Sequence, residues 1–264
     1  MKVYISADIE GITNVTNWDE TQINHSAHQA SQKQMTREVL AACRGAVKAG
    51  ATEIFVKDAH GSARNILPEE MLDEVTLIRG WTNEPESMVA GLDSSFDALI
   101  CIGYHSAAYG GGNPLAHTMN LQNNYIRING RTAAEFDLNT YVAAQHGVPS
   151  VFISGDEEIC QHARELVPEI ETVGVKYGIG NATFNMSADK ACRLIEKGVE
   201  EALKKTDACL MKEPERYDVE INFKEAVNAF RASFYPGVEQ VDAKTVRYTA
   251  ANAHEMMTTR MFIL

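Results

Sequence analysis

Apolar residues follow two different periodicities along the first two thirds of the chain. Short runs rich in β-branched residues predict strands at 2–7, 53–57, 75–78, 97–103, 125–128 and 150–154. Between them, apolar residues three and four positions apart predict helices at 29–48, 132–146 and 157–166, with a brief helix at 85–92. Strands that alternate with helices in this way are typical of a parallel sheet with helices on its faces.

The pattern changes after about residue 165. A strand at 173–177 and a helix at 188–205, capped by Ser187, precede a strand at 217–223 in which apolar and polar residues alternate. A helix at 226–233, a strand at 245–249 and a helix at 252–261 follow. We therefore expect an α/β protein, with a three-layer parallel-sheet domain at 1–170 and a smaller α+β domain at 171–264. No proline- or serine-rich linker marks the boundary, which we place between 165 and 190.

The composition is that of a globular protein with an excess of acidic groups. Of 264 residues, 45% are hydrophobic, and 36 Asp and Glu against 24 Lys and Arg give a formal net charge of −12. This charge repels both a nucleic-acid backbone and an anionic membrane surface, so we expect neither as a partner. The five cysteines are scattered, and no signal-peptide pattern or long apolar run is present. We therefore expect reduced thiols and a cytoplasmic protein.

Residue types that bind metals follow three of the predicted strands. Asp8 and Glu10 follow the first strand, His60 the second, and His105 the strand at 97–103. Because parallel strands point their carboxyl ends to one edge of a sheet, we expect these side chains to converge there. Two carboxylates and two imidazoles suit one or two Zn²⁺, Mn²⁺ or Co²⁺ ions, and Asp8 is a natural bridge between two ions. Each residue alone is as readily a helix cap, a loop charge or a surface histidine, so the argument depends on all four.

Two further segments carry candidate residues. The glycine-rich stretch at 104–117 lacks the Gly-Lys-Ser/Thr of a phosphate-binding loop, and it brings His117 back towards His105. Glu135 opens the helix at 132–146, where it either complements the helix dipole or projects into the site as another ligand. We interpret the acidic run at 156–158 as a helix cap rather than a metal site. The chain has no H-E-x-x-H helix and no G-x-S-x-G elbow, and no G-x-G-x-x-G follows the first strand.

These segments resemble the M55 family of metallopeptidases, the D-aminopeptidases first named dipeptide-transport proteins. The matching pieces are KVYISADIEGI, KDAHG, MVAGLD with GYHS, AHTM, AEFDLNTY and GVPSVFISGD, which occur in family order within roughly residues 1–156. The resemblance implies a three-layer α/β domain beside an α+β domain. It also implies ring-shaped homodecamers of two stacked pentamers enclosing a chamber, and removal of N-terminal D-residues such as D-Ala from short peptides.

Carried over residue by residue, the resemblance implies two Zn²⁺ ions per subunit. The matching ligand positions are Asp8, Glu10, His60, His105 and Glu135. Asp8 matches the bridging carboxylate, and His117 matches the proposed catalytic histidine. The loop at 110–114 and the segment with His25 and His28 depart from the family pattern, which puts the substrate preference in doubt more than the chemistry.

The expected mechanism uses a water molecule activated by two metal ions to attack the scissile carbonyl. His117 would serve as general base, oxyanion donor or nucleophile, and the sequence does not choose among these roles. An alternative is a two-metal hydrolase of a phosphoester or a cyclic amide, because Lys57 and Arg131 lie close in sequence to candidate ligands. Another is a non-catalytic peptide-binding or transport accessory protein, which a spare histidine beside an open metal site disfavours.

Overall fold

Two β-sheets organise the computed structural model, which describes residues 1–264. The first sheet has seven strands, all parallel except for the antiparallel pair at one edge. In spatial order they are β3 (Val75–Ile78), β2 (Glu53–Asp58), β1 (Lys2–Ala7), β4 (Ala98–Tyr104), β7 (Ser150–Asp156), β8 (Glu171–Ile179) and β9 (Ala182–Asn185).

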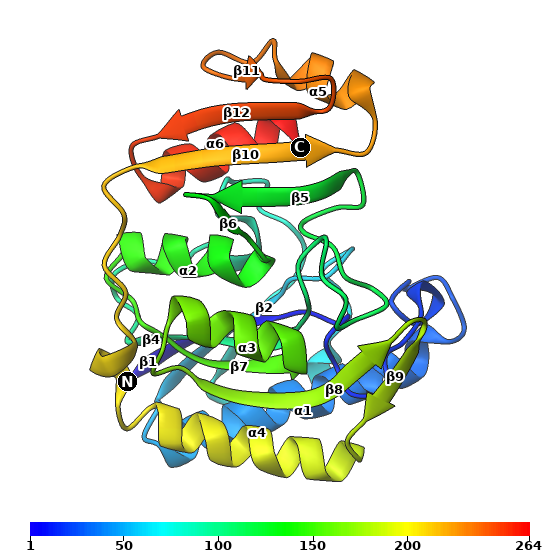
Figure 1. Ribbon diagram of the computed structural model, residues 1–264. Coiled ribbons are helices and arrows are strands. Elements are labelled where there is room, and N and C mark those ends of the chain that lie inside the picture. The colour runs from blue at the N-terminus through cyan, green and yellow to red at the C-terminus, as the bar shows by residue number, and fades with distance from the viewer.

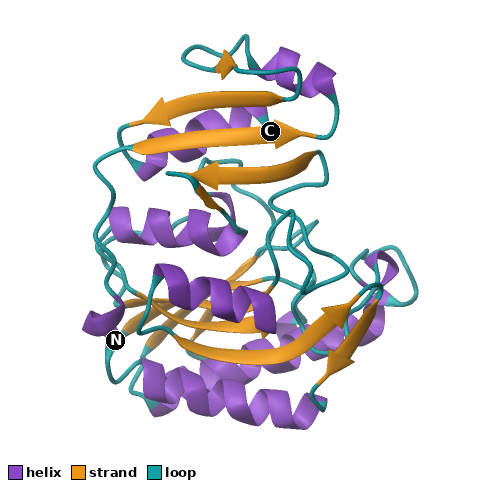
Figure 2. Ribbon diagram, viewed as in Figure 1, coloured by secondary structure: helices purple, strands orange, loops and turns teal.

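Helices cover both faces of the first sheet, as Figures 1 and 2 show. One face carries α1 (His28–Lys48) and α4 (Ala188–Ala202), which pack on each other, and the other face carries α2 (Glu135–Gln145) and α3 (Glu157–Leu166). The three-layer α/β architecture expected from the alternating pattern is thereby confirmed. No helix is both long enough and apolar enough to cross a membrane.

The second sheet is antiparallel and lies beyond α2 in Figure 1. Its strands are, in spatial order, β11 (Glu239–Gln240), β12 (Thr245–Ala250), β10 (Tyr217–Phe223), β5 (Asn123–Ile128) and β6 (Arg131–Thr132). The helices α5 (Ala226–Ala232) and α6 (Ala253–Ile263) pack against it. Because β10 alternates as predicted, its odd-numbered residues are buried while the residues between them are half-buried.

The division of the chain into two domains stays a prediction, but the two sheets do not part near residue 170. β5 and β6 precede residue 170 but belong to the second sheet, whereas β8 and β9 follow residue 170 and belong to the first sheet. The sequence at 125–128 and 173–177 indicates strands without indicating which sheet each strand joins, because pairing is decided by contacts between segments far apart in the chain.

Local predictions differ from the structure in several places. The brief helix expected at 85–92 is a single 3-10 turn, η3 (Ser87–Val89), and the positive φ of 52° at Ser87 is incompatible with a regular α-helix. Helix α2 begins at Glu135 because the preceding residues pair with β5 as strand β6. Ser187 occupies the N-cap position of α4 but its side chain makes no capping hydrogen bond. The short edge strand β9 carried no recognised signal.

The order of the strands places a binding crevice between β1 and β4. Chain connections from β1 run to β2 and β3 on one side, whereas β4, β7 and β8 continue on the other side. Ligands of open α/β sheets bind beyond the carboxyl ends of the strands at such a reversal. β1 and β2 end level, because Ala7 pairs with Asp58, and the neighbouring β4 continues for two residues beyond Ile102, its partner of Ala7.

Glycine allows the chain to turn tightly above these strand ends. The Gly11 N–H donates to the Gly103 carbonyl at 2.8 Å, and a Cβ on Gly11 would lie 1.7 Å from the Tyr104 carbonyl oxygen. Gly103 itself has a φ of +71°, a conformation that disfavours L side chains. The loop after β1 can therefore pass directly over the end of β4, which brings its acidic residues to the crevice.

Candidate active site

The structure brings all six predicted site residues together at this edge of the first sheet. Asp8 and Glu10 lie in the loop after β1, His60 follows β2 and His105 follows β4. His117 comes from the long loop between β4 and β5, and Glu135 is the first residue of α2. The side chains of Asp8, Glu10, His105 and Glu135 are each at most 5% exposed, so the cluster is withdrawn from bulk water.

Asp8 joins two groups of ligand-type atoms. Its Oδ1 lies 3.3 Å from His60 Nδ1, which is 3.0 Å from Glu10 Oε2. Its Oδ2 lies 3.4 Å from His105 Nε2, and that nitrogen is also 3.4 Å from Glu135 Oε2. The two oxygens of one carboxylate thus face two separate sets of partners, as is typical of a carboxylate between two cations.

Each of the three histidines is oriented by a backbone carbonyl. His60 Nε2 lies 2.9 Å from the Thr21 carbonyl oxygen, His105 Nδ1 lies 2.9 Å from that of Ser106, and His117 Nδ1 lies 2.9 Å from that of Leu115. If these nitrogens donate their protons, the opposite nitrogen of each neutral ring presents a lone pair to a carboxylate. A nitrogen lone pair and a carboxylate oxygen repel each other unless a proton or a metal cation lies between them. Histidines that bind metals usually donate their other ring N–H to a carbonyl or carboxylate in this way.

The pKa values show how strongly the cluster attracts positive charge. Burial alone would favour neutral Glu10, but the charge of the adjacent His60 outweighs it and holds the Glu10 pKa well below its usual range. Burial likewise opposes the charged form of His60, yet Glu10 and Asp8 raise the His60 pKa well above its usual value. Glu135 and Asp8 raise the His105 pKa in the same way. Bound metal ions would take the place of these protons.

The residues present fit a zinc site. Glu10 Oε2 and His105 Nε2 are buried without a hydrogen-bond partner, which is costly unless a cation satisfies them. The separations of 3.0–3.4 Å between donor atoms match the edge of roughly 3.3 Å of a tetrahedron with ~2.0–2.1 Å bonds to the metal. Two sets of donor atoms, each within 4.8 Å of one another, are close enough to share an ion: His105 with His117 and Glu135, and Asp8 with Glu10 and His105.

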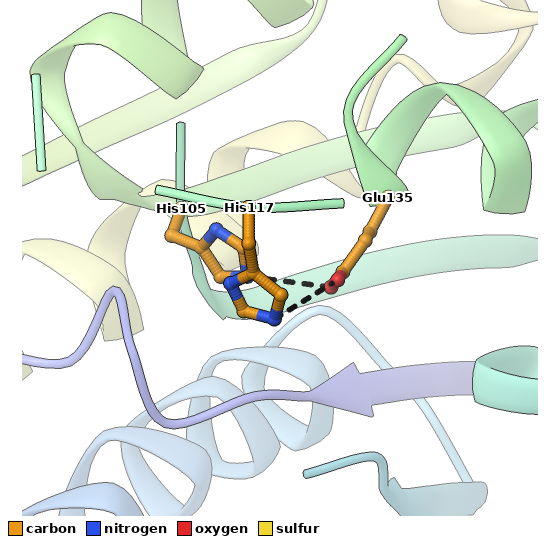
Figure 3. Close-up of side chains that lie close together, drawn as sticks. All are labelled: His105, His117 and Glu135. Atoms are coloured by element: carbon orange, nitrogen blue, oxygen red, sulfur yellow. Dashed lines mark ion pairs between the residues drawn. The ribbon is translucent and has the colours of Figure 1, made fainter. Parts of the chain in front are cut away.

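His117 is held by contacts on both sides of its ring. It stacks on His105 with centroids 4.3 Å apart, and the edge of Trp18 lies against it at 5.4 Å. Figure 3 shows His105 and His117 turned towards the carboxylate of Glu135. The Met119 N–H donates to Glu135 Oε1 at 2.6 Å, and Met119 has a positive φ of 67°. Strained backbone of this kind is common in functional loops.

Asp156, at the end of β7, supports the loop that carries His105 and His117. Its carboxylate accepts hydrogen bonds from the backbone and hydroxyl of Ser106 and from the side-chain amide of Asn113. It also caps α3 through the Ile159 N–H, which confirms the capping interpretation of the acidic run. Asp156 therefore ties the end of β4, the long loop and α3 together beneath the cluster.

Lys176 of β8 supports the other side of the cluster. Its buried ammonium donates to the backbone carbonyls of Glu10 and Val15, and Asn113 donates to the same Glu10 carbonyl. Burial lowers the Lys176 pKa to about 8, against the opposing effect of nearby carboxylates including Asp156. The sequence offered no signal for this role, because Lys176 lies 166 residues from Glu10.

The cluster opens into a cavity of about 330 Å³ that has an acidic wall and aromatic sides. Its lining residues are Asp8, Glu10, Trp18, Thr21, Gln22, Ala59, His60, Gly61, Trp81, Met88, His117, Met119 and Glu135. No lysine or arginine lines it. Trp18, Trp81 and Met119 were not recognised from the sequence, since nothing local distinguishes them from core residues. His25 is exposed beside Asp19, and buried His28 lies 3.0 Å from Asn65, so neither lines this cavity.

Lys57 and Arg131, the two residues that suggested phosphate binding, do not line this cavity. Lys57 donates to the carbonyls of Asp58 and Gly80 and lies 4.1 Å from the centre of the Trp81 ring. Arg131 donates to Asp137 and Glu165. With both groups engaged, the cavity offers no cationic donors for phosphate oxygens.

The fold and the buried cluster define a metal-dependent hydrolase of the peptidase class. The model of the Peptidase M55 family, described as D-aminopeptidase, matches residues 1–262, and the chain belongs to this family. A D-aminopeptidase of Bacillus subtilis (strain 168) is 32% identical over 260 residues, which cover 97% of this chain and 93% of that protein. The chain is accordingly a metallo-aminopeptidase.

The fold also matches a solved structure over its whole length. That structure is of the Zn-dependent D-aminopeptidase DppA from Bacillus subtilis, a self-compartmentalizing protease. The TM-score is 0.94 at 30% sequence identity, with 100% of this chain and 96% of that chain covered. The match includes the second sheet, which lies outside the segments that carried the sequence resemblance.

Proposed function

We propose that this protein is a zinc-dependent aminopeptidase that releases N-terminal D-residues, such as D-Ala, from short peptides. The observation that carries the proposal is the buried cluster in which the two oxygens of Asp8 face separate imidazole and carboxylate partners. The similarity to D-aminopeptidases of Bacillus subtilis supports the substrate class.

Two metal ions per subunit account best for the two groups of donor atoms. Asp8 would contribute one oxygen to each ion, Glu10 and His60 would complete one group of ligands, and His105 and Glu135 would complete the other. Zinc bound there supplies Lewis-acid polarisation of the scissile carbonyl and lowers the pKa of a water molecule. Mn²⁺ and Co²⁺ suit the same oxygen and nitrogen donors.

His117 performs the proton chemistry in this proposal. Its Nδ1 is held by the Leu115 carbonyl, so its Nε2 is free to take a proton from a nucleophile and to give it to the leaving amine. Nε2 lies 3.6 Å from Glu135 Oε1, which stabilises the imidazolium that forms. Stacking on His105 and the edge of Trp18 hold the ring in this orientation and restrict the access of water.

The lining of the cavity disfavours the phosphoester alternative. Bound zinc ions would offset the negative charge of Asp8, Glu10 and Glu135. No lysine or arginine lines the cavity to bind the remaining oxygens of a phosphate. His117 lines the same cavity beside the proposed metal ligands, where it can exchange a proton with a bound peptide. This favours an enzyme over a protein that only binds peptides.

Hydrolysis of matched D-Ala and L-Ala di- and tripeptides by the zinc-loaded protein, with a chelator-treated control, tests the proposal. We expect chelator-sensitive cleavage of the D-Ala peptides only. Cleavage of the L-peptides would overturn the stereospecificity but keep the metal mechanism. No cleavage of either series, with two metal ions confirmed bound, would contradict the aminopeptidase assignment.

We also propose that the chain assembles into a decamer of two pentameric rings. Two elements with exposed apolar side chains, α5 and the β8–β9 hairpin, lie in the upper and the lower part of the subunit in Figure 1. These side chains are Val227, Phe230 and Phe234 on α5 and the turn after it, and Ile179 and Phe184 on the hairpin. Two different patches are what head-to-tail ring contacts require. Native mass spectrometry tests the assembly, and a monomer at micromolar concentration would contradict it.

A further inference from the structure

A second cavity shares His117 with the metal cavity. It has a volume of about 340 Å³ and is lined by Ala108, Tyr109, Ala116, His117, Asn123, Asn124, Tyr125, Asn222 and Lys224. The residues come from the long loop between β4 and β5, from β5 itself and from the end of β10. A side chain that takes part in both cavities places the second one next to the reacting centre.

The two cavities differ in the charged side chains that line them. Three carboxylates and no lysine or arginine line the metal cavity, whereas the second cavity has no carboxylate and one lysine, Lys224. This contrast occurs in a chain with a net charge of −12. Lys224 is exposed and takes part in none of the ion pairs of the structure, so its ammonium group is free to bind an anion.

The backbone of Lys224 is fixed although its side chain is free. Phe223, the last residue of β10, is fully buried. The Lys224 N–H donates to the Gln122 carbonyl at 2.8 Å, and the Lys224 carbonyl accepts from Lys244 Nζ at 2.6 Å. The amine therefore projects from an anchored point at the cavity wall.

Asparagine side chains supply ordered polar groups in the same cavity. Asn124 Nδ2 donates to Asn222 Oδ1 at 2.7 Å, and Asn222 Nδ2 donates to Thr245 Oγ1 at 2.8 Å. Asn123 is 2% exposed, and its Oδ1 is buried without a hydrogen-bond partner.

We propose that the second cavity is a subsite for the C-terminal end of the peptide substrate, in which Lys224 binds the terminal carboxylate. The inference rests on the proposed aminopeptidase function and deepens it. A short peptide cleaved at its N-terminal end in the metal cavity would extend past His117 into the second cavity, where Lys224 complements the negative charge of its terminal carboxylate. Lys224 would select peptides with a free carboxylate that are short enough to reach it.

The test compares each D-Ala di- and tripeptide with its C-terminal amide, which has the same shape but no negative charge. Of the dipeptide and the tripeptide, we consider the one with a free carboxylate that the wild-type protein cleaves faster. We expect its kcat/KM to be about tenfold above that of its amide, which is the effect of one charge-assisted hydrogen bond. Lys224→Met should remove this preference through a higher KM for the acid, with the amide unchanged. Lys224→Arg should restore the preference. Lys190→Met, which removes an exposed lysine of α4 that lines neither cavity, should leave it intact.

The outcomes separate this inference from the function on which it rests. If the wild type cleaves these peptides and Lys224→Met shows the same ratio of kcat/KM between acid and amide, the subsite is overturned while the aminopeptidase function stands. Absence of cleavage of all acids and amides would contradict the proposed function. In that event, calorimetric binding of the same acids and amides to the zinc-loaded wild type and Lys224→Met decides the subsite. Equal affinities in the two proteins would overturn it.

Discussion

His105 and His117 stack with ring planes only 9° apart, and both turn Nε2 towards the carboxylate of Glu135. Their surroundings differ. His105 Nε2 also lies 3.4 Å from Asp8 Oδ2 and is buried, whereas His117 makes its ion pair with Glu135 and borders two cavities. The proposed mechanism assigns metal binding to His105 and proton transfer to His117.

Replacement of His117 tests this difference. We expect His117→Ala to keep its zinc, because the groups joined by Asp8 remain, and to lose turnover by a factor on the order of 10²–10⁴, as loss of a general acid–base group does. Metal analysis and kcat for a D-Ala dipeptide measure both effects. His146→Ala, at the opposite end of α2 from Glu135, is the matched control. An unchanged kcat would remove His117 from the mechanism.

Replacement of Asp8 tests the bridge between the two groups of donor atoms. Asp8→Asn keeps the size of the side chain but exchanges one oxygen, which faces His60 or His105, for an NH₂ group that cannot bind a metal. We expect the dialysed variant to hold less zinc than the wild type and to lose activity in proportion. Asp19→Asn, at an exposed aspartate, is the control. Full occupancy by two ions in Asp8→Asn would refute the bridging role.

Asp156 is expected to act through the loop that it anchors. Asp156→Asn places an amide opposite the donors of Ser106 and Asn113 and leaves fewer acceptors for them. We expect a loss of about 1–3 kcal/mol of unfolding free energy, as for other buried hydrogen-bonded groups, and a lower kcat. Urea denaturation and kinetics measure these effects, with Asp73→Asn on the surface as the control. A variant as stable as the wild type would show that the network carries no net stability.

Lys176 predicts a pH dependence of stability. Its folded pKa of about 8 lies below the ordinary value of 10.5, so between these pH values the unfolded chain binds more protons than the folded chain. The cost of burying the ammonium is therefore complete below pH 8 and is relieved as the pH rises towards 10.5. Relative to Lys176→Met, the wild type should gain on the order of 2–3 kcal/mol across this window, since one pKa unit is worth about 1.4 kcal/mol.

Urea denaturation of the chelator-treated proteins at several pH values measures this gain without interference from metal binding. Lys190→Met is the matched control, because its lysine is exposed and unpaired. If the stability curves of the wild type and Lys176→Met run parallel from pH 8 to 10.5, the buried amine does not titrate in this window.

Much of the fold could be predicted because its signals are local. The residues of β1, β3 and β10 coincide with the predicted strands, since period-two alternation and β-branched runs depend only on neighbouring residues. Asp8, Glu10, His60 and His105 could be predicted to lie together for a related reason. Parallel strands align their carboxyl ends whatever the details of packing, so residues that follow them share an edge.

The tertiary structure alone decided which segments complete the site. Lys176 meets the Glu10 carbonyl, Lys224 borders a cavity with His117, and β5 pairs with β10 rather than with the first sheet. Each of these contacts joins residues about a hundred positions apart or more. The sequence by itself determined the elements and the ligand types, because periodicity and side-chain chemistry are properties of short segments. The division of labour between the two cavities came from packing, because burial and long-range pairing exist only in the folded chain.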